Sequence, residues 1–302
     1  MQNRLAIGVC AKNEEGGIAT CLTSILKSAN RLSCDWNLYI CVNGSTDSTL
    51  VQIHRWITKT GFQCKVLVLP HANLVEAQRC IVNQAVVDKC NYYGFIDADT
   101  KIHKYCIPYL MDRIVKNKNI KAVYGLSIPS KTHKPTLIER IMNNYDQPKA
   151  EVYSARKHLH GRAFITTDWN IPKNIEEPLI CDDIYLSCYL LKKYGEQSIQ
   201  GVENAQVQFK QIRSFEDYYK LYKRHKLEKD KVLKNYNEFK TLPTDQVYRQ
   251  FLPKNLLHDS LKNGLLWVLL LGIKQVASYR LTIEKLFYPH VKPQWEETLT
   301  SK

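Results

Sequence analysis

The sequence of 302 residues lacks the cysteine spacing of zinc-binding and redox proteins. None of its ten cysteines form a C-x-x-C pair, which excludes zinc-ribbon and thioredoxin-like motifs. Most of the cysteines lie inside apolar segments, such as Leu38 to Val42. We therefore expect buried free thiols in a reducing cytosol and no disulfide framework.

Long apolar runs are also missing. The longest apolar stretch without a charged residue extends from Asn263 to Ile273, whereas a membrane-spanning helix needs roughly 20 residues. No cleavable apolar segment follows Met1 to Arg4, so we expect no secretory leader. These observations predict a cytoplasmic protein without a membrane span.

Acidic residues are in the minority. The chain contains 29 Asp and Glu against 43 Lys and Arg, which gives a formal net charge of +14. Such an excess predicts an anionic partner: nucleic acid, an acidic membrane surface or a phosphorylated ligand. With 44% hydrophobic residues and no internal repeat, the composition is typical of a globular protein and excludes a fibrous or disordered one.

Strand-like and helix-like segments alternate through the first third of the chain. Continuous apolar runs predict buried strands, and apolar residues at i, i+3, i+4 spacing predict helices between them. The expected strands are 5–11, 38–42, 64–69 and 92–96, and the expected helices are 18–29, 48–58 and 75–87. This alternation predicts an α/β fold, with a mostly parallel, Rossmann-like central sheet flanked by helices.

The rest of the chain is less regular. We expect strands at 121–127 and 200–209, a strand or loop at 158–167, and helices at 182–194 and from residue 215 onward.

Polar clusters follow three of the predicted strands. Asn13-Glu14 follows the first strand, Asn43 to Asp47 follows the second, and Asp97-Ala98-Asp99 follows the fourth. Open parallel sheets bind ligands at the carboxyl ends of their strands, so these clusters mark the expected site. Carboxylates at i and i+2 are suited to a hard cation such as Mg²⁺. An Asp in such a turn can also simply cap the next helix.

Three segments have both a functional and a structural interpretation. The stretch from Asn43 to Thr49 would bring backbone close to a ligand or serve as a capping loop. Asp182-Asp183 opens the predicted helix at 182–194, either as a general base or as a cap of the helix N-terminus. The run from Lys223 to Lys226 would form a phosphate-binding flap or a solvated helix face.

In order and spacing, these clusters resemble the motifs of the family 2 glycosyltransferases of the GT-A fold. That family has Asn-Glu after its first strand, a Ser-Thr-Asp-x-Thr turn after the second, an Asp-Ala-Asp-Thr segment and a helix that begins acid-Asp-x-x-Leu. The matching segments here are Asn13-Glu14, Ser45 to Thr49, Asp97 to Thr100 and Asp182 to Leu186. The resemblance covers residues 4 to 230.

The resemblance implies an enzyme that moves one sugar from a nucleoside-diphosphate sugar to an acceptor hydroxyl. Its cofactor would be a divalent cation, Mg²⁺ or Mn²⁺. Asp99 and Asp97 would bind the metal ion, and Asp183, preceded by Asp182, would be the catalytic base of a single displacement with inversion. The residues expected to contact the donor are Asn13, Glu14, Asn43, Asp47, Asp97, Arg224 and His225.

The resemblance also suggests how the chain is divided. Residues 1–128 would bind the nucleotide sugar, 129–240 would bind the acceptor as the other half of the same domain, and 241–302 would form a C-terminal helical extension.

Three departures from the family pattern matter. Cys10-Ala11-Lys12 replaces the usual Pro-x-Tyr, so contacts to the nucleotide in that loop would differ. The acid before the catalytic Asp is usually Glu and is here Asp182. The Gln-x-x-Arg-Trp motif of processive members is missing, and the segment from Tyr222 to Lys226 offers only Arg224 and His225. Transfer of a single sugar is therefore expected.

The acceptor would be a glycan or a lipid-linked, lipopolysaccharide-type molecule of the cell envelope. Residues 210 to 240 hold ten Lys and Arg against five Asp and Glu. We therefore expect residues 210 to 274 to make a peripheral contact with an anionic membrane. In the alternative, Leu265 to Ile273 is a buried helix that closes the domain.

Two rival functions remain. A nucleotidyltransferase acting on a sugar phosphate shares the topology and the acidic metal site. Against it, the N-terminal region offers only Gly16-Gly17 and no glycine-rich phosphate loop with a lysine. A nucleic-acid-binding protein would explain the positive charge, but no helix-turn-helix, zinc-finger or RNP pattern supports it. We therefore expect no nucleic-acid partner.

Overall fold

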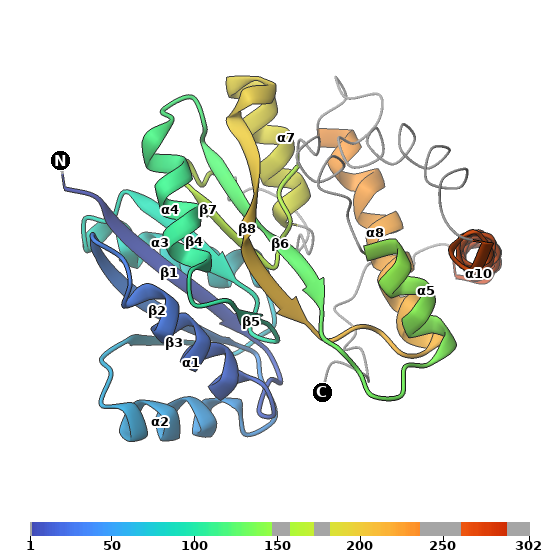
Figure 1. The fold of residues 1–302 in the computed structure, drawn as a ribbon, viewed down its shortest axis with the longest axis horizontal. Coiled ribbons are helices and arrows are strands. Elements are labelled where there is room, and N and C mark those ends of the chain that lie inside the picture. Colours follow the sequence, from blue (N-terminus) through green and yellow to red (C-terminus); the bar gives the residue numbers. More distant parts are fainter. Residues whose placement is uncertain (1, 147–157, 172–181, 236–260, 289–302) are drawn as a thin grey trace. The chain divides into compact units, whose positions relative to one another are not determined.

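The computed structural model describes residues 2–146, 158–171, 182–235 and 261–288 (Figure 1). The chain forms two compact units, one of residues 1–127 and 156–209 and the other of residues 128–155 and 210–302. Residues 156–209 return to the sheet of the first unit. The boundaries expected at 128 and 240 stay predictions. The functions expected for the two halves stay predictions.

The first unit is built on an eight-stranded sheet with the order β3-β2-β1-β4-β7-β6-β8-β5. Its first four strands are parallel, as the alternation of strands and helices predicts. These strands are β1 (Arg4–Ala11), β2 (Asp35–Asn43), β3 (Lys65–Leu69) and β4 (Tyr92–Ile96). The helices between them are α1 (Ile18–Ala29), α2 (Thr49–Thr60) and α3 (Leu74–Val87).

The antiparallel pairs of the sheet involve its other strands. Strand β7 pairs with both β4 and β6, and β5 pairs with β8. These strands are β5 (Lys101–Ile102), β6 (Ala122–Pro129), β7 (Ala163–Thr166) and β8 (Ile199–Phe209). Between these strands in the sequence lie α4 (Cys106–Lys116), α7 (Asp182–Tyr194) and the 3₁₀ turn η1 (Glu196–Ser198). The predicted fold class, a mostly parallel α/β sheet flanked by helices, is confirmed.

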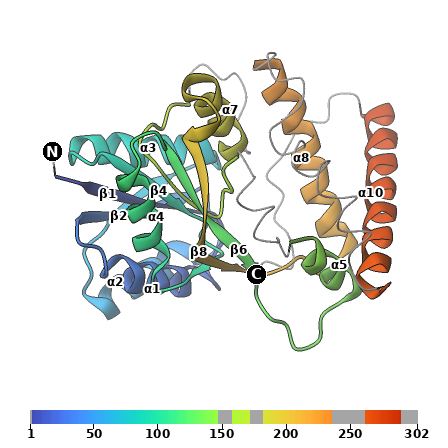
Figure 2. The same cartoon turned by 45° about the horizontal axis from the view of Figure 1, so that its top comes forward.

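Both faces of β1 are covered, which explains its continuous apolar run. Leu5, Ile7 and Val9 belong to the same core cluster as the buried residues of α1. On the other face, a Cβ placed at Gly8 would lie 3.0 Å from Ile81 of α3. Figure 2 shows α1 and α2 on one side of the strands and α3 on the other. Polar residues are therefore left for the strand ends.

The predicted free thiols are confirmed for the part of the chain that the structure describes. Nine cysteines lie in it, and all nine are free. Burial raises the pKa of Cys106 to about 12, so that thiol stays protonated at neutral pH.

The helices that the structure describes in the second unit are α5 (Leu137–Asp146), α8 (Phe215–Asn235) and α10 (Leu261–Phe287). Its core joins Ile141 and Met142 of α5, Tyr218 and Tyr219 of α8, and α10. The α10 residues of this core are Trp267, Leu270, Ala277 and Leu281, which recur at helical spacing.

The expectation that the chain holds no segment long enough to span a membrane is wrong on length. Gly264–Phe287 of α10 is long and apolar enough to cross one, and 22% of its most apolar window is buried. Lys274 and Arg280 interrupt the apolar run without ending the helix. Lys274 lies over the ring of Tyr145, and Arg280 pairs with Glu216. The alternative of a helix simply buried between Leu265 and Ile273 also fails, because Leu265 is 60% exposed.

Candidate active site

Four carboxylates from two separate segments lie close together in the first unit. Asp97 and Asp99 follow β4, and Asp182 and Asp183 begin α7. Asp97 keeps an exposed surface, although the protein around its carboxylate removes part of the water that would solvate the charge. Burial raises its pKa well above the usual value, and the charges of Asp99, Asp182 and Asp183 raise it further. The structure therefore brings the predicted metal-binding and catalytic acids together.

The turn after β4 explains why the two acids have an alanine between them. Ala98 is buried, so its neighbours Asp97 and Asp99 are left on the outer side of the turn. The backbone N–H and the hydroxyl of Thr100 both donate to the carbonyl oxygen of Asp97, at 3.2 and 2.7 Å. The Asp97 N–H donates to the carbonyl oxygen of Arg162 at 3.0 Å. The main chain of this acidic turn is thus held on both sides.

Asp182 is buried and bound to a neighbouring helix. The Gln78 Nε2 group of α3 donates to its Oδ2 at 2.5 Å. Burial and the charge of Asp183 raise the pKa of Asp182 to about 7. Gln78 Oε1 is buried as well and has no hydrogen-bond partner among the described residues. This carboxyl group is therefore partly protonated near neutral pH, unlike an ordinary aspartate.

Asp183, the predicted base, is held by backbone N–H groups. Gly161 N–H donates to its Oδ2 at 3.0 Å, and Ile184 N–H donates to its Oδ1 at 2.8 Å. Its carbonyl oxygen accepts from Ser187 Oγ at 2.5 Å, and Ser187 Oγ in turn accepts from Leu159 N–H at 2.8 Å. The segment before β7 and the start of α7 thus fix the direction of this carboxylate.

Glu14, Asp97 and Asp99 all lie within electrostatic reach of one thiol, that of Cys21. The pKa of Cys21 in α1 is raised by burial and then by the charges of Asp99, Asp97 and Glu14. The Cys21 thiol also donates to the carbonyl oxygen of Asp97 at 3.4 Å. The loop after β1 and the acidic turn after β4 therefore meet at the carboxyl ends of adjacent strands.

The loops after β1 and β2 are joined by side chains that the sequence assigned to the donor. Asn13 has a φ of 54°. Its Oδ1 accepts from Thr46 N–H at 2.7 Å, and its own N–H donates to Ser45 Oγ at 3.1 Å. Asp47 accepts from Glu15 N–H at 3.1 Å and from the hydroxyl of Thr49 at 2.5 Å.

Asn43 joins the end of β2 to the loop before α3 in a similar way. Its side chain is buried at the end of β2, and its Oδ1 accepts from Asn73 N–H at 2.7 Å. Asn13, Asp47 and Asn43 therefore shape the loops around the site. A direct contact between any of them and a donor stays a prediction.

Arg162 and His160 are site residues that the sequence analysis missed. The Arg162 guanidinium lies 3.4 Å from the ring centroid of Phe209, and its charge lowers the pKa of Asp97. Its Nη1 lies 3.3 Å from Nε2 of His160, whose Nδ1 lies 3.5 Å from the Ser127 hydroxyl. The segment 158–167 carried no motif, so only its nearness to the acids in the fold reveals this cation.

Cys10 stands where the family pattern has the Pro of Pro-x-Tyr, and it lies within electrostatic reach of Asp182 and Asp97. Burial raises the pKa of this thiol well above the usual value, and the charges of Cys41, Asp182 and Asp97 add to the effect. A neutral thiol at this position adds no charge to a site that already holds four carboxylates.

Arg224 and His225 lie in α8, which belongs to the second unit. Arg224 is half-buried, and His225 is exposed. Their assignment to the phosphates of the donor stays a prediction.

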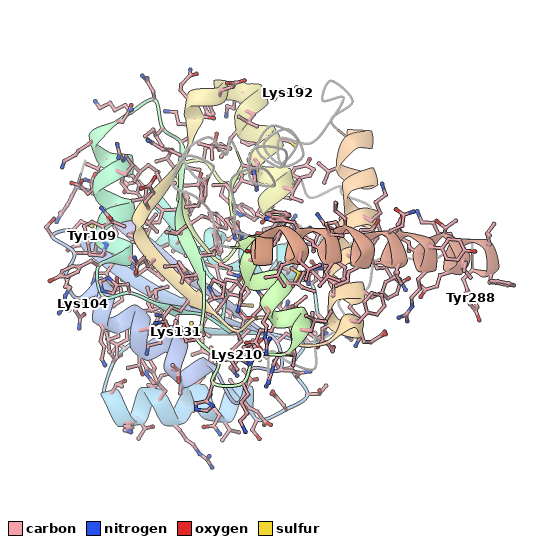
Figure 3. All side chains as sticks on the ribbon, turned by 45° about the vertical axis from the view of Figure 1, so that its right-hand side comes forward. Lys104, Tyr109, Lys131, Lys192, Lys210 and Tyr288 are labelled. Atoms are coloured by element: carbon pink, nitrogen blue, oxygen red, sulfur yellow. The ribbon has the colours of Figure 1, made fainter. Side chains whose placement is uncertain are left out.

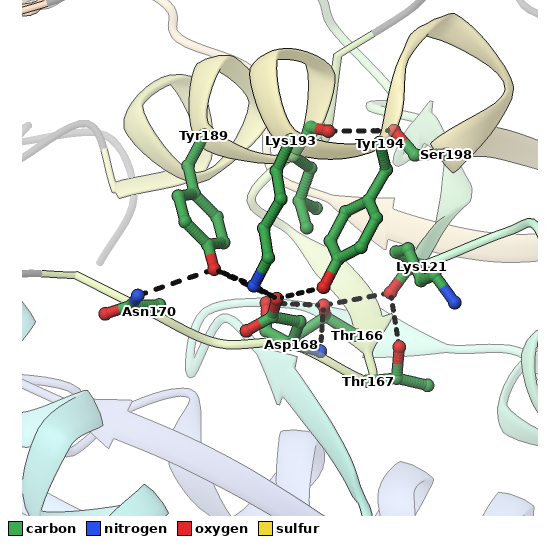
Figure 4. A network of polar contacts seen from close by, with 10 residues as sticks. Lys121, Thr166, Thr167, Asp168, Asn170, Tyr189, Lys193, Tyr194 and Ser198 are labelled. Carbon is green, nitrogen blue, oxygen red and sulfur yellow. Dashed lines mark hydrogen bonds and ion pairs between the residues drawn. The ribbon is translucent and has the colours of Figure 1, made fainter.

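The carboxylate of Asp168 fixes the C-terminal half of α7. Asp168 Oδ2 accepts from Tyr189, Lys193 and Tyr194, at 3.0, 2.8 and 2.7 Å (Figure 4). Burial raises the pKa of Asp168, but these hydrogen bonds outweigh burial and leave it below the usual value. This network ties the segment after β7 to the helix that begins with the two catalytic candidates.

The acids fit a divalent cation that is shared with a substrate. Asp97 and Asp99 offer hard oxygen ligands, and a cation would relieve the repulsion among the four carboxylates. Within the described ranges, no three His, Cys, Asp or Glu side chains are grouped so that they could hold an ion. Mg²⁺ and similar ions are commonly bound by one or two carboxylates together with substrate phosphates. The predicted metal site thus suits a phosphate-bearing ligand.

The fold and the acidic site define a GT-A type glycosyltransferase. A model of glycosyl transferase family 2 matches residues 6–230, and the chain belongs to this family. A search of curated protein sequences gave no match.

Two solved structures illustrate the similarity. One is the mannosyltransferase PcManGT from Pyrobaculum calidifontis in complex with GDP-Man and Mn²⁺. It is 12% identical, the match covers 96% of this chain and 89% of that one, and the TM-score is 0.61. The other is S. aureus TarS 1-349 in complex with UDP-GlcNAc. It is 14% identical, with 91% and 81% covered and a TM-score of 0.51. These likenesses support the GT-A fold.

Proposed function

We propose that this protein transfers a single sugar from a nucleoside-diphosphate sugar to the hydroxyl of a glycan or lipid-linked acceptor, with inversion at the anomeric carbon. The observation that carries the proposal is the meeting of Asp97 and Asp99 with Asp182 and Asp183 at the carboxyl end of β4. The family makes a nucleotide sugar the expected donor. A nucleotide sugar is also bound in the similar structures of PcManGT and TarS.

The residues divide the reaction between them. Asp99 and Asp97 would hold Mg²⁺ or Mn²⁺ against the diphosphate, where the ion supplies Lewis-acid stabilisation of the leaving group. Asp183 Oδ2 is oriented by the N–H of Gly161. It accepts the proton of the acceptor hydroxyl while the hydroxyl oxygen attacks the anomeric carbon. Attack from the face opposite the leaving group inverts the configuration in one step. A second nucleophile is not required.

Two neighbouring groups adjust the charge of this site. Arg162 places a cation beside Asp97, which favours the ionised carboxylate that a metal ion requires. Asp182, with its raised pKa and its hydrogen bond from Gln78, contributes less negative charge beside Asp183 than an ordinary aspartate would. Asp183 therefore stays the stronger candidate for the base.

The test is to screen nucleotide sugars by thermal shift with and without Mn²⁺. A true donor should raise the melting temperature more when the ion is present, because a ligand that binds only the native state stabilises it. Asp99→Asn should lose the Mn²⁺-dependent part of the shift. Asp112→Asn, at an exposed acid paired with Lys116 on α4, is the matched control and should keep it.

Transfer is then measured as release of nucleoside diphosphate with glycan and lipid-linked acceptors. Asp183→Asn should still bind the donor but should transfer ~10²–10⁴-fold more slowly, the usual contribution of a positioned base. Release of pyrophosphate in place of nucleoside diphosphate would support a nucleotidyltransferase. Transfer by Asp183→Asn at the parental rate would show that the base is another group.

A further inference from the structure

The α10 helix has two faces of different character. Trp267, Leu270, Ala277 and Leu281 are buried against α5 and α8. The opposite face is exposed and apolar over almost the whole helix. Its exposed members are Leu265, Val268, Val276, Tyr279, Ile283, Leu286 and Phe287, between 37% and 76% exposed.

This exposed face carries no charge along its centre. At 100° per residue, Leu265, Val268, Gly272, Val276, Tyr279, Ile283 and Leu286 fall within one quarter of the helix circumference. Figure 3 shows α10 along its length, with Tyr288 labelled just beyond its C-terminal end. A helix of 27 residues is about 40 Å long. An apolar strip of this length is unusual on a soluble protein and indicates an interaction surface.

Arg280 and Glu284 of α10 lie away from this strip and are paired within the second unit. Arg280 pairs with Glu216, and Glu284 pairs with Lys223, both across to α8. The Arg280 guanidinium also lies 3.9 Å from the ring centroid of Tyr219. One side of α10 is thus fixed to a charged helix, which suits a helix that lies along a surface and not one surrounded by lipid.

The charge of the second unit indicates what the strip meets. Residues 128–155 and 210–302 contain 22 Lys and Arg against 13 Asp and Glu, which is nine of the fourteen excess positive charges of the chain. Two copies of such a unit repel each other, whereas a surface of anionic lipid attracts each of them. Apolar residues on one face and cationic surroundings are the combination found in helices that lie in a membrane interface.

We propose that α10 docks the protein on an anionic phospholipid bilayer, with the strip from Leu265 to Leu286 in the interface plane. This docking does not depend on the proposed transfer reaction. Where the acceptor is lipid-linked, docking would bring the enzyme to the surface that presents it.

The test is flotation of the full-length protein with two kinds of vesicle, phosphatidylcholine alone and phosphatidylcholine with phosphatidylglycerol. The protein should float with the anionic vesicles at low salt, and less with the neutral ones. The double variant Val268→Asp/Val276→Asp places two carboxylates on the strip and should lower binding at least about tenfold. Both positions are more than half exposed, so the fold should tolerate the change.

Val51→Asp is the matched control, since Val51 is a 49% exposed valine on α2 of the first unit. It should float like the parent protein, and all variants should keep their donor-dependent thermal shift. Flotation of the double variant at the parental level, or no flotation of the parent at low salt, would overturn the proposal. Binding that survives alkaline carbonate would indicate a spanning helix. If the parent protein forms a dimer without lipid and the double variant does not, the partner of the strip is a second copy of the chain.

Discussion

The Gly161 N–H donates to Oδ2 of Asp183 at 3.0 Å, and a Cβ placed on Gly161 would lie 3.1 Å from that same oxygen. The residue that orients the proposed base thus has no room for a side chain. This contact is tighter than ordinary van der Waals contact, so either the carboxylate or the backbone before β7 must move when a methyl group is added.

Gly161→Ala should therefore lower transfer while leaving donor binding intact. A displacement of even 1 Å at a reacting group can cost about a hundredfold in rate, and we expect a loss of about tenfold or more in kcat. The control is Gly272→Ala on α10, where a Cβ meets nothing within 4 Å. Steady-state kinetics with a donor found by the thermal-shift screen would check this. Parental kcat in Gly161→Ala would mean that Asp183 is not positioned through this contact.

Asp182 should make stability depend on pH in an unusual direction. Burial and Asp183 raise its folded-state pKa to about 7, whereas an unfolded Asp titrates near 3.9. Between these values the folded state holds a proton that the unfolded state has released. This group therefore lowers the free energy of unfolding as the pH rises through that window.

Asp182→Asn should remove this dependence. Measured with EDTA and without donor, the melting temperature of the variant relative to the parent should be higher at pH 8 than at pH 5. Because Asp182 is buried, we expect a difference of about 1–3 kcal/mol, or a few degrees for a chain of this size. The exposed Asp112→Asn change should show no such trend. An equal difference at both pH values would mean that the Asp182 pKa is ordinary.

Arg162 should determine the pH range in which the donor binds together with Mn²⁺. Its guanidinium lowers the pKa of Asp97, against burial and the charge of Asp99, which raise it. In Arg162→Gln the pKa of Asp97 should rise, and protons should compete with Mn²⁺ up to a higher pH. The midpoint of Mn²⁺-dependent donor binding should therefore move to higher pH, as measured by titration calorimetry across a pH series.

Phe209→Leu separates the effect of the Arg162 charge from the effect of its packing on the Phe209 ring. This variant keeps the guanidinium and removes the aromatic ring 3.4 Å beneath it. Its midpoint should stay close to the parental one, although binding weakens where Arg162 becomes more mobile. If Arg162→Gln leaves the midpoint unchanged, another cation controls Asp97.

The sequence predicted what depends on local pattern. The strand at 92–96 and the helix at 182–194 have the bounds that were expected, because apolar runs and an acidic helix start are features of neighbouring residues. The approach of Glu14, after β1, to the acids after β4 followed from parallel topology, whereas the place of Asp182 and Asp183 followed from the family resemblance.

Local sequence patterns did not predict the contacts between segments that are distant in the sequence. Gln78 and Asp182 are 104 residues apart, and neither has a motif that points to the other. Arg162 becomes a site residue only because β7 pairs antiparallel with β4, a pairing that no periodicity specifies. From the sequence we expected residues 210 to 274 to contact an anionic membrane, but the sequence did not indicate which face of α10 is exposed. Apolar composition predicts burial, and only the packing shows which side of a helix is covered.

A comparison of Gly44 with Gly61 separates two effects of an alanine substitution. One is a change in the shape of the loop after β2, and the other is backbone strain. Their φ angles are nearly equal, 64° and 66°, so alanine at either position meets the same left-handed penalty, roughly 1–2 kcal/mol. Their surroundings differ. A Cβ at Gly44 would overlap the backbone nitrogen of Ala72, whereas a Cβ at Gly61 meets nothing within 4 Å.

Gly44→Ala should therefore cost at least about 2 kcal/mol more free energy of unfolding than Gly61→Ala, since the loop at 71–73 must move away. That movement pulls Asn73 N–H from Oδ1 of Asn43, so donor binding should weaken as well. Gly61→Ala, at the end of α2, should leave donor affinity unchanged. Urea denaturation and donor titration of both variants would check this. Equal losses of stability, with equal donor affinities, would mean that the approach of Gly44 to Ala72 does not shape the site.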